Sequence, residues 1–193
     1  MKEQCVFAGF GGQGMLLIGK FLAEAGMQSG LIFSDIAVSK GLNVTWSPSY
    51  GSAMRGGTAN CSVVISDQPV ASPMISAADS VLAMNLPSMV KFEKLLKPGG
   101  LLLVNSSIIN EKAGRSDIEV VYVPCNAIAE KIGNPKGANV VFLGAYLAKK
   151  AEVVSVDTAI EAIRTELGES KAKFLDGNIK ALHAGMEYVN SLN

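Results

Sequence analysis

The chain has 193 residues, of which 49% are hydrophobic and 18% are charged. Its 17 basic and 17 acidic residues cancel, which argues against nucleic acid or an anionic membrane as a partner. No apolar run reaches the roughly 18 residues that a membrane span requires, so we attribute the hydrophobic content to a buried sheet and a subunit interface, including a contact between two copies. We expect one cytoplasmic domain over residues 1–193, because the chain enters its first strand without a signal peptide.

A glycine-rich turn stands between the first predicted strand, residues 5–8, and a predicted helix over residues 15–25. The first segment is apolar throughout, as buried strands are, and bulky residues recur at helical spacing in the second. The glycines fit the G-x-G-x-x-G spacing of dinucleotide-binding turns. Backbone N–H groups in such a turn favour an anion or the edge of a cofactor; otherwise the turn only lets helix and strand pack closely. The candidate cofactor-binding residues here are Gly9, Gly11, Gly12, Gln13 and Gly14.

Residues 31–38 are compatible with two structures. A strand beginning at Leu31 would place Asp35 about 20 residues beyond the glycine turn, where nicotinamide-binding folds carry the acid that binds the ribose. The same residues also continue a helix to Lys40, with Gly41 as its stop. We favour the helix, because residues 42–47 then form an independent strand.

Residues 47–61 are mostly small and turn-forming, and we interpret them as a functional loop. Arg55 lies in it beside two glycines, where its guanidinium suits a phosphate or a carboxylate; a structural salt bridge is the alternative. The preceding strand ends at Trp46 as the first ends at Phe10, so we expect both loops to meet at the carboxyl edge of a sheet. The candidate binding residues of this loop are Ser49, Tyr50, Gly51, Arg55, Gly56 and Gly57.

Strands and helices alternate along the rest of the chain. The pattern predicts an α/β fold, a three-layer αβα arrangement with a mostly parallel, Rossmann-like sheet and helices on both faces. Asn85 and Asn105 follow two of the strands, and we add them to the candidate cofactor-binding residues. The remaining predicted strands are residues 59–66, 80–84, 101–104 and 118–123, and the helices are 88–96, 126–132, 139–148 and two within 157–192.

Three local features accompany these elements. Residues 97–100, Lys-Pro-Gly-Gly, are predicted to end the helix 88–96. Gly144 and Ala145 give the helix 139–148 a small-residue face suited to close packing. Asp157 is predicted to cap the first helix of the tail.

The cysteines and the single histidine do not form a known motif. There is no C-x-x-C, so the chain carries neither an iron–sulfur nor a zinc pattern of that kind. Cys5 and Cys61 lie in apolar strands and are predicted core residues, whereas Cys125 follows a strand at a position open to exposure. His183 has no cysteine, serine or acid at motif spacing, so we interpret it as a surface or half-buried residue.

Several blocks of residues, in order along the chain, resemble the gamma subunit of the 2-oxoacid:ferredoxin oxidoreductases, most closely the 2-oxoglutarate or branched-chain type. The resemblance extends from the first strand to about residue 150. Residues 31–41 depart from the pattern and look inserted. Ser52 and Ala53 stand where a proline and an acid are usual, which leaves Arg55 without its expected neighbour. The matching blocks are residues 9–14, 49–51, 54–61 and 105–107.

The resemblance implies oxidative decarboxylation of a 2-oxoacid with coenzyme A, giving acyl-CoA and carbon dioxide, with electrons passed to ferredoxin. It implies that thiamine diphosphate, magnesium and iron–sulfur clusters belong to partner subunits, namely alpha, beta and a ferredoxin-like delta chain. This chain would then be inactive alone, and we assign it no catalytic residue and no metal ligand. The glycine turn and the Arg55 loop would face the active centre.

Two other functions remain open at this point. The glycine turn with Asp35 suits a self-sufficient NAD-dependent dehydrogenase, although the sequence has no Tyr-x-x-x-Lys pair and no partner acid for His183. The glycine turn alone also suits a regulatory module that binds coenzyme A or a nucleotide.

Overall fold

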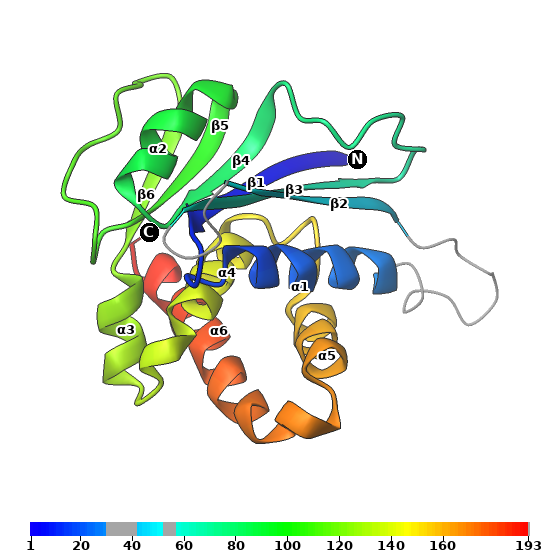
Figure 1. Cartoon of the computed structure of the whole chain (residues 1–193), viewed down its shortest axis with the longest axis vertical. Helices are drawn as coiled ribbons and strands as arrows, with labels where there is room; N and C mark the ends of the chain where they lie inside the picture. Colours follow the sequence, from blue (N-terminus) through cyan, green and yellow to red (C-terminus); the bar gives the residue numbers. More distant parts are fainter. Residues whose placement is uncertain (30–41, 52–56, 193) are drawn as a thin grey trace.

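The computed structural model describes residues 1–29, 42–51 and 57–192. Within these ranges, six strands form one sheet in the order β2-β3-β1-β4-β5-β6 (Figure 1). The strands are β1 Lys2–Phe10, β2 Asn43–Tyr50, β3 Thr58–Ser66, β4 Ala78–Ala83, β5 Leu96–Asn105 and β6 Glu119–Val123. The α-helices are α1 Met15–Gln28, α2 Leu86–Phe92, α3 Cys125–Lys131, α4 Ala138–Lys149, α5 Val156–Leu167 and α6 Leu175–Asn190. The 3-10 helices are η1 Glu93–Leu95, η2 Pro135–Gly137 and η3 Glu169–Phe174.

The sheet is mixed but mostly parallel, as predicted. β1, β4, β5 and β6 pair in parallel, each with its neighbour. β3 runs antiparallel to both β1 and β2, because β2 and β3 form a hairpin. This hairpin places the amino end of β3 beside the carboxyl end of β1, where Phe10 pairs with Thr58.

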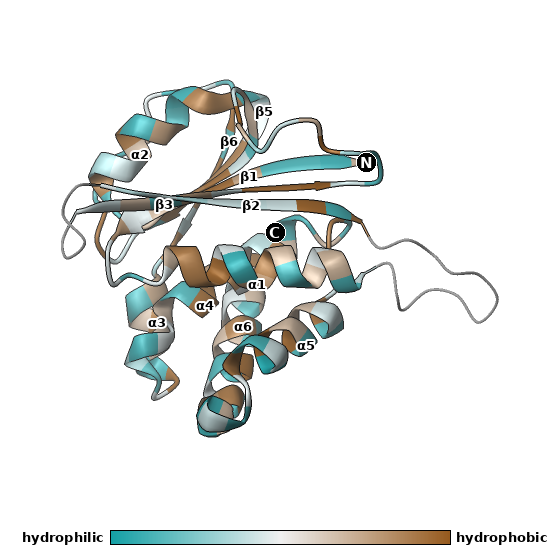
Figure 2. Cartoon of the chain, turned by 45° about the vertical axis from the view of Figure 1, so that its right-hand side comes forward, coloured by the Kyte–Doolittle hydropathy of each residue, from teal (hydrophilic) through white to brown (hydrophobic). Residues whose placement is uncertain are grey.

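Helices cover both faces of the sheet, which confirms the predicted three-layer arrangement. α1 and α4 lie on one face and α2 lies on the other (Figures 1 and 2). α5 packs on α1, and α6 packs on α4. Successive residues of a strand point to opposite faces, so Cys5 and Phe7 join the core beneath α1 and α4, whereas Val6 and Ala8 join the core beneath α2.

The hairpin has one polar face. α2 lies against β1 and β4 and does not extend over the edge strand β2. Four residues of β2 and β3 on that side are half-buried and polar, namely Thr45, Ser47, Asn60 and Ser62, whereas Val64 on the same side is buried. The alternation of polar and apolar residues towards the carboxyl end of β2 and the amino end of β3 therefore reflects a part of the sheet that α2 does not cover.

This polar face explains why part of the hairpin was predicted as a loop. The predicted loop 47–61 is too long, because residues 47–50 continue β2 and residues 58–61 already belong to β3. Pro48 is tolerated there because β2 is an edge strand, which can leave one backbone position without a hydrogen-bond donor. The alternative structures of residues 31–41, including the position of Asp35, lie outside the described residues.

Two further predictions were wrong in detail. Residues 97–100 do not end a helix but form a bulge in β5, where Gly99 has a φ of +75° and the pairing with β4 shifts register. The first tail helix, α5, is capped by Ser155, whose Oγ accepts a hydrogen bond from the Thr158 N–H at 3.2 Å. Asp157 lies in the first turn of that helix instead.

Glycines let α4 and α6 approach closely, as the small-residue face at Gly144 predicted. A Cβ on Gly144 would lie 1.9 Å from the carbonyl oxygen of Leu182, and a Cβ on Gly185 would lie 1.9 Å from that of Val141. The two backbones are therefore in contact at this crossing. In the part of the chain that the structure describes, no helix is both long and apolar enough to cross a membrane.

Candidate functional site

The glycine turn joins β1 to α1 as the sequence predicted. Gly12 and Gly14 have φ values of +96° and +75°, which residues with a Cβ rarely adopt. The N–H of Gln13 donates to the carbonyl oxygen of Phe10 at 3.1 Å, and the Gln13 Oε1 accepts from the Phe10 N–H at 2.6 Å. Backbone and side chain of Gln13 thus both fix the turn to the end of β1.

The two predicted loops meet, as expected. The N–H of Gly11 donates to the carbonyl oxygen of Gly57 at 2.9 Å, so the glycine turn contacts the residue that precedes β3. Gly51 donates to the Thr58 carbonyl oxygen at 2.8 Å, which closes the hairpin at the same edge of the sheet. Tyr50 is 60% exposed at the end of β2. Ser49 is exposed as well, whereas Arg55 and Gly56 lie outside the described residues.

The turn still offers backbone donors, although fewer than predicted. Gly11 was predicted as a donor to a ligand, but its N–H is taken by Gly57. Among the described residues, the N–H groups of Gly12 and Gly14 have no protein acceptor. Gly14 caps α1 without a side-chain hydrogen bond, so the first N–H groups of that helix are also available. An anion would bind favourably at this end of α1.

A cavity of about 410 Å³ opens beside the turn. Its walls come from segments that follow β1, β4, β5 and β6 and from the start of α4, so it lies at the carboxyl edge of the sheet. Such a crevice is where open α/β sheets bind ligands. The lining residues are Gly12, Gln13, Met84, Ile108, Asn126, Pro135, Lys136, Ala138 and Asn139.

Asn85 and Asn105 lie behind this wall. Asn85 is 2% exposed; its Oδ1 accepts from the Ser88 N–H, and its Nδ2 donates to the Gln13 Oε1 at 3.0 Å. Asn105 is fully buried and donates to the Asn126 Oδ1 at 2.9 Å. Both side chains hold residues that line the cavity, and their direct contact with a ligand stays a prediction.

Sequence reasoning missed three polar residues of the cavity, Asn126, Lys136 and Asn139. Asn126 follows β6 closely, as Asn85 follows β4, and Asn105 is the last residue of β5, so the same strand-end signal was present. Lys136 and Asn139 lie more than a hundred residues from the glycine turn. No local pattern connects them with it, since only the packing of α4 on the sheet brings them there.

The cysteines are core residues, including Cys125, for which exposure was predicted. All three cysteines are buried. Cys125 is the first residue of α3 and lies on the buried side of that helix. Burial raises the pKa of the Cys61 thiol to about 12 and raises the pKa of the Cys125 thiol well above its usual value. Within the described ranges no group of three or more His, Cys, Asp or Glu side chains could hold a metal ion.

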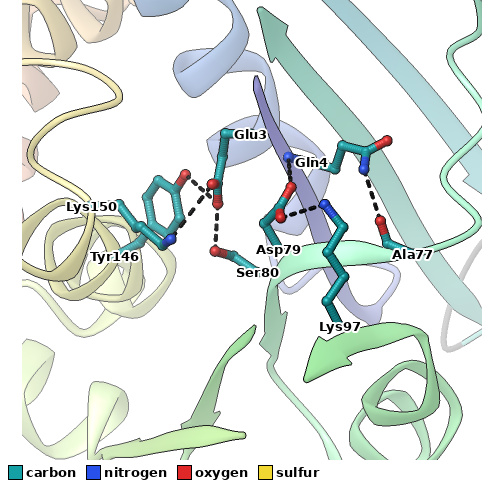
Figure 3. A network of polar contacts seen from close by, with 8 residues as sticks. All are labelled: Glu3, Gln4, Ala77, Asp79, Ser80, Lys97, Tyr146 and Lys150. Atoms are coloured by element: carbon teal, nitrogen blue, oxygen red, sulfur yellow. Dashed lines mark hydrogen bonds and ion pairs between the residues drawn. The ribbon is translucent and has the colours of Figure 1, made fainter. Parts of the chain in front are cut away.

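A second polar cluster lies at the opposite edge of the sheet (Figure 3). Glu3 of β1 is buried; its Oε1 accepts from the Ser80 hydroxyl at 2.5 Å and from the Tyr146 hydroxyl at 3.3 Å. Its Oε2 lies 3.6 Å from the Lys150 Nζ. Burial raises the pKa of the Glu3 carboxyl, and the hydrogen bond from Ser80 and the charge of Lys150 oppose that shift. The cluster ties α4 to β1 and β4, away from the cavity.

The sheet order bears on the NAD-dependent alternative. In the dinucleotide-binding arrangement a parallel strand adjoins β1 and ends near the acid that binds the ribose. Here the antiparallel β3 adjoins β1, and β2 lies one strand further out. The position that a ribose-binding acid would need is therefore occupied by the start of β3.

Fold and cavity define an α/β protein that presents a glycine turn and an amide-lined crevice at the carboxyl edge of its sheet. The family model for pyruvate ferredoxin/flavodoxin oxidoreductase matches residues 29–188. The 2-oxoglutarate synthase subunit KorC of Methanothermobacter marburgensis is 32% identical over 98% of this chain and 97% of KorC. The ketoisovalerate oxidoreductase subunit VorA of Methanothermobacter thermautotrophicus is 36% identical over 94% of this chain. The present chain spans only 35% of the length of that VorA protein.

Two solved structures of 2-oxoacid:ferredoxin oxidoreductases are also similar to this chain. The gamma subunit of a keto/oxoacid ferredoxin oxidoreductase from Geobacter sulfurreducens has a TM-score of 0.78 and 29% identity, covering 98% of this chain and 99% of that one. The 2-oxoglutarate:ferredoxin oxidoreductase from Magnetococcus marinus shares the fold, with a TM-score of 0.84 and 20% identity over all of this chain and 32% of that one. The chain belongs to the pyruvate ferredoxin/flavodoxin oxidoreductase family.

Proposed function

We propose that residues 1–193 act as one gamma-type domain that supports the CoA-dependent oxidative decarboxylation of a 2-oxoacid. The products are acyl-CoA and carbon dioxide, and the electrons pass to ferredoxin. The observation that carries this proposal is the cavity beside the glycine turn, at the edge where the Gly11 N–H meets the Gly57 carbonyl. The choice of substrates is supported by the structure of the Magnetococcus marinus enzyme, which has 2-oxoglutarate, coenzyme A and succinyl-CoA bound.

Coenzyme A carries phosphates, and this chain offers two kinds of group for them. The N–H groups of Gly12 and Gly14, which have no acceptor among the described residues, and the first turn of α1 form a cradle without side-chain charge at the positive end of a helix. Lys136 adds a cation at the wall of the cavity. In this proposal Arg55 supplies a further charge for a phosphate or for the carboxylate of the oxoacid, from the loop between β2 and β3.

The reactive groups belong to the partners in this proposal. Thiamine diphosphate would supply the carbanion chemistry and iron–sulfur clusters the electron path, and both would be held, with magnesium, by alpha, beta and ferredoxin-like delta subunits. In its described part, this chain has no group of three or more His, Cys, Asp or Glu side chains that could hold a metal ion. The role of this chain is to bind and position coenzyme A.

Copurification tests the proposal. An affinity-tagged chain, purified from its native source, is expected to bring down chains that contain thiamine diphosphate and iron–sulfur clusters. The complex should reduce ferredoxin only when both a 2-oxoacid and coenzyme A are present. Hydride transfer to NAD by the purified chain alone would favour a dehydrogenase instead, and failure to recover any such partner would favour a regulatory module.

Arg55 gives a sharper test at the level of one residue. We expect Arg55→Ala to raise the apparent KM for coenzyme A or for the oxoacid in the assembled complex by about tenfold, because a charge-assisted hydrogen bond is lost. Steady-state kinetics with each substrate varied in turn measures the effect. Unchanged kinetics would remove Arg55 from the site.

A further inference from the structure

The amide side chains of the cavity wall have fixed orientations, because a hydrogen bond to a backbone group or to a neighbouring amide holds one end of each. Gln13 Oε1 accepts from the Phe10 N–H and from the Asn85 Nδ2. A backbone N–H can only donate, so the Gln13 oxygen must occupy this end. The Gln13 amide NH₂ is therefore the end that is left for the cavity.

The same reasoning orients Asn126. The Oδ1 of Asn105 accepts from the backbone N–H groups of Ser107 and Cys125, both at 3.2 Å. The Nδ2 of Asn105 must then donate, and it does so to the Asn126 Oδ1 at 2.9 Å. The Asn126 amide NH₂ is therefore the free end of that side chain.

Asn139 presents the opposite polarity. Its Nδ2 donates to the carbonyl oxygen of Gly14 at 3.3 Å, and a carbonyl oxygen can only accept. The Asn139 Oδ1 is then the free end. In the described part of the chain, none of the three free ends is among the buried polar atoms that lack a partner.

The cavity wall thus offers two NH₂ donors and one carbonyl acceptor in fixed positions. This set complements a secondary amide, which has one carbonyl acceptor and one N–H donor. Met84, Ile108 and Pro135 supply apolar surface between the polar groups, and none of the described lining residues carries a carboxylate. A volume of about 410 Å³ lies within the usual range for small-molecule pockets.

We propose that this cavity binds a secondary amide of the pantetheine arm of coenzyme A. The amides of Gln13 and Asn126 donate to its carbonyl oxygen, and the Asn139 Oδ1 accepts from its N–H. This inference rests on the proposed function, in which coenzyme A is the substrate that carries such amides. Because backbone groups hold Gln13 and Asn139, and the Asn105 side chain holds Asn126, little ordering is required when the arm binds.

The ligand side of the test uses pantetheine, which lacks the nucleotide and its phosphates. Calorimetry with the purified chain, and with the complex, compares pantetheine with two analogues in which one amide N–H is replaced by an ester oxygen. We expect one of the two esters to bind about tenfold more weakly, since it leaves the Asn139 Oδ1 unpaired. Equal binding of all three ligands would overturn the inference.

The protein side uses Asn139→Ala and Asn126→Asp. Asn139→Ala should bind the amide and the sensitive ester equally, because the group that distinguishes them is gone. Asn126→Asp keeps an oxygen that accepts from Asn105 and replaces the free donor with an acceptor, so pantetheine should bind at least about tenfold more weakly. Asn110→Asp, on an exposed residue outside the lining, adds the same charge as a control and should bind normally.

The outcomes separate this inference from the proposed function. Variants that weaken coenzyme A but leave pantetheine unaffected would place the contact at the phosphates and overturn the inference alone. A complex that does not use coenzyme A, beside a chain that still distinguishes amide from ester, would overturn the proposed function alone. If Asn139→Ala does not fold, the three ligands on the unaltered chain still decide the question.

Discussion

At the scale of the residue, Gly12 has the most specific requirement in the turn. Its φ of +96° is one that a β-branched residue hardly adopts, yet a Cβ there would meet no atom within 4 Å. The requirement is therefore one of backbone conformation, and not one of packing. Gly14 differs, because a Cβ there would lie 2.3 Å from the Asn139 Nδ2.

We expect Gly12→Val to abolish CoA-dependent turnover of the complex while partner chains still assemble. The side chain would fill the space in front of the free N–H groups, and the strain should amount to about 1–3 kcal/mol. Gly99→Val is the matched control, since Gly99 has a φ of +75° and equally open surroundings in the β5 bulge. Kinetics and copurification are measured for both; full activity of Gly12→Val would mean that the turn serves packing only.

At the scale of the element, the crossing of α4 and α6 tolerates no added atom. We expect Gly144→Ala to destabilise the chain by about 3 kcal/mol or more, because the new methyl group would have to displace the backbone of α6. Gly177→Ala on α6 is the control: its nearest contact is the Asn134 Nδ2 at 3.3 Å, so helix propensity should make it neutral or slightly stabilising. Urea unfolding compares the two, and a neutral Gly144→Ala would contradict the close approach.

The Glu3 cluster makes the stability of the sheet depend on pH. The pKa of Glu3 is raised in the folded state above its usual value of 4.5, so the folded chain binds the proton more tightly than the unfolded chain. The contribution of Glu3 to stability is thus most favourable below about pH 4.5 and is lost as pH rises through the raised pKa. Glu3→Gln keeps an oxygen for Ser80 and removes the titration.

We therefore expect the stability of Glu3→Gln, relative to the unaltered chain, to increase as pH rises from about 4.5 towards 7. Urea midpoints at several pH values measure this difference directly, and other carboxyl groups cancel because both proteins contain them. A difference that is constant with pH, or that decreases, would show that Lys150 and Ser80 outweigh the burial of the Glu3 carboxyl.

At the scale of the whole molecule, local patterns predicted the strands and helices well, and long-range pairing decided the rest. The turn 9–14 and the alternation of strands and helices carry their own signals, so the α/β fold followed from them. The direction of β3 did not, because its residues Ala59–Ser66 read as a strand in either orientation. Residues 47–50 resembled a loop because Ser47 lies on the polar face and Pro48 is tolerated at an edge.

The residues of the candidate site also fall into those that a local pattern predicted and those that only the folded chain brings together. Gly12 and Gln13 were predicted from one contiguous motif, and both line the cavity. Asn126 and Asn139 were not predicted, because the sequence around an asparagine does not indicate which atom of its side-chain amide will be without a hydrogen bond inside the protein. That polarity depends on Asn105 and on the Gly14 carbonyl, which only the folded chain brings within reach.

The hairpin and the central strands should also differ in stability against local opening. β1, β4 and β5 lie within the sheet, and their central residues are buried on both faces, whereas β2 lies at an edge with half-exposed or exposed residues. In the isolated chain we expect β2 amides to exchange with deuterium on the order of tenfold or more faster than those of residues 6–8, 81–83 and 102–104, because fewer buried contacts must be lost when β2 opens. Exchange followed by mass spectrometry at two protein concentrations tests this, and equal rates at both concentrations would exclude self-association as the source of protection. If β2 exchanges as slowly as β1 in a chain that remains monomeric, the hairpin does not open separately from the central strands.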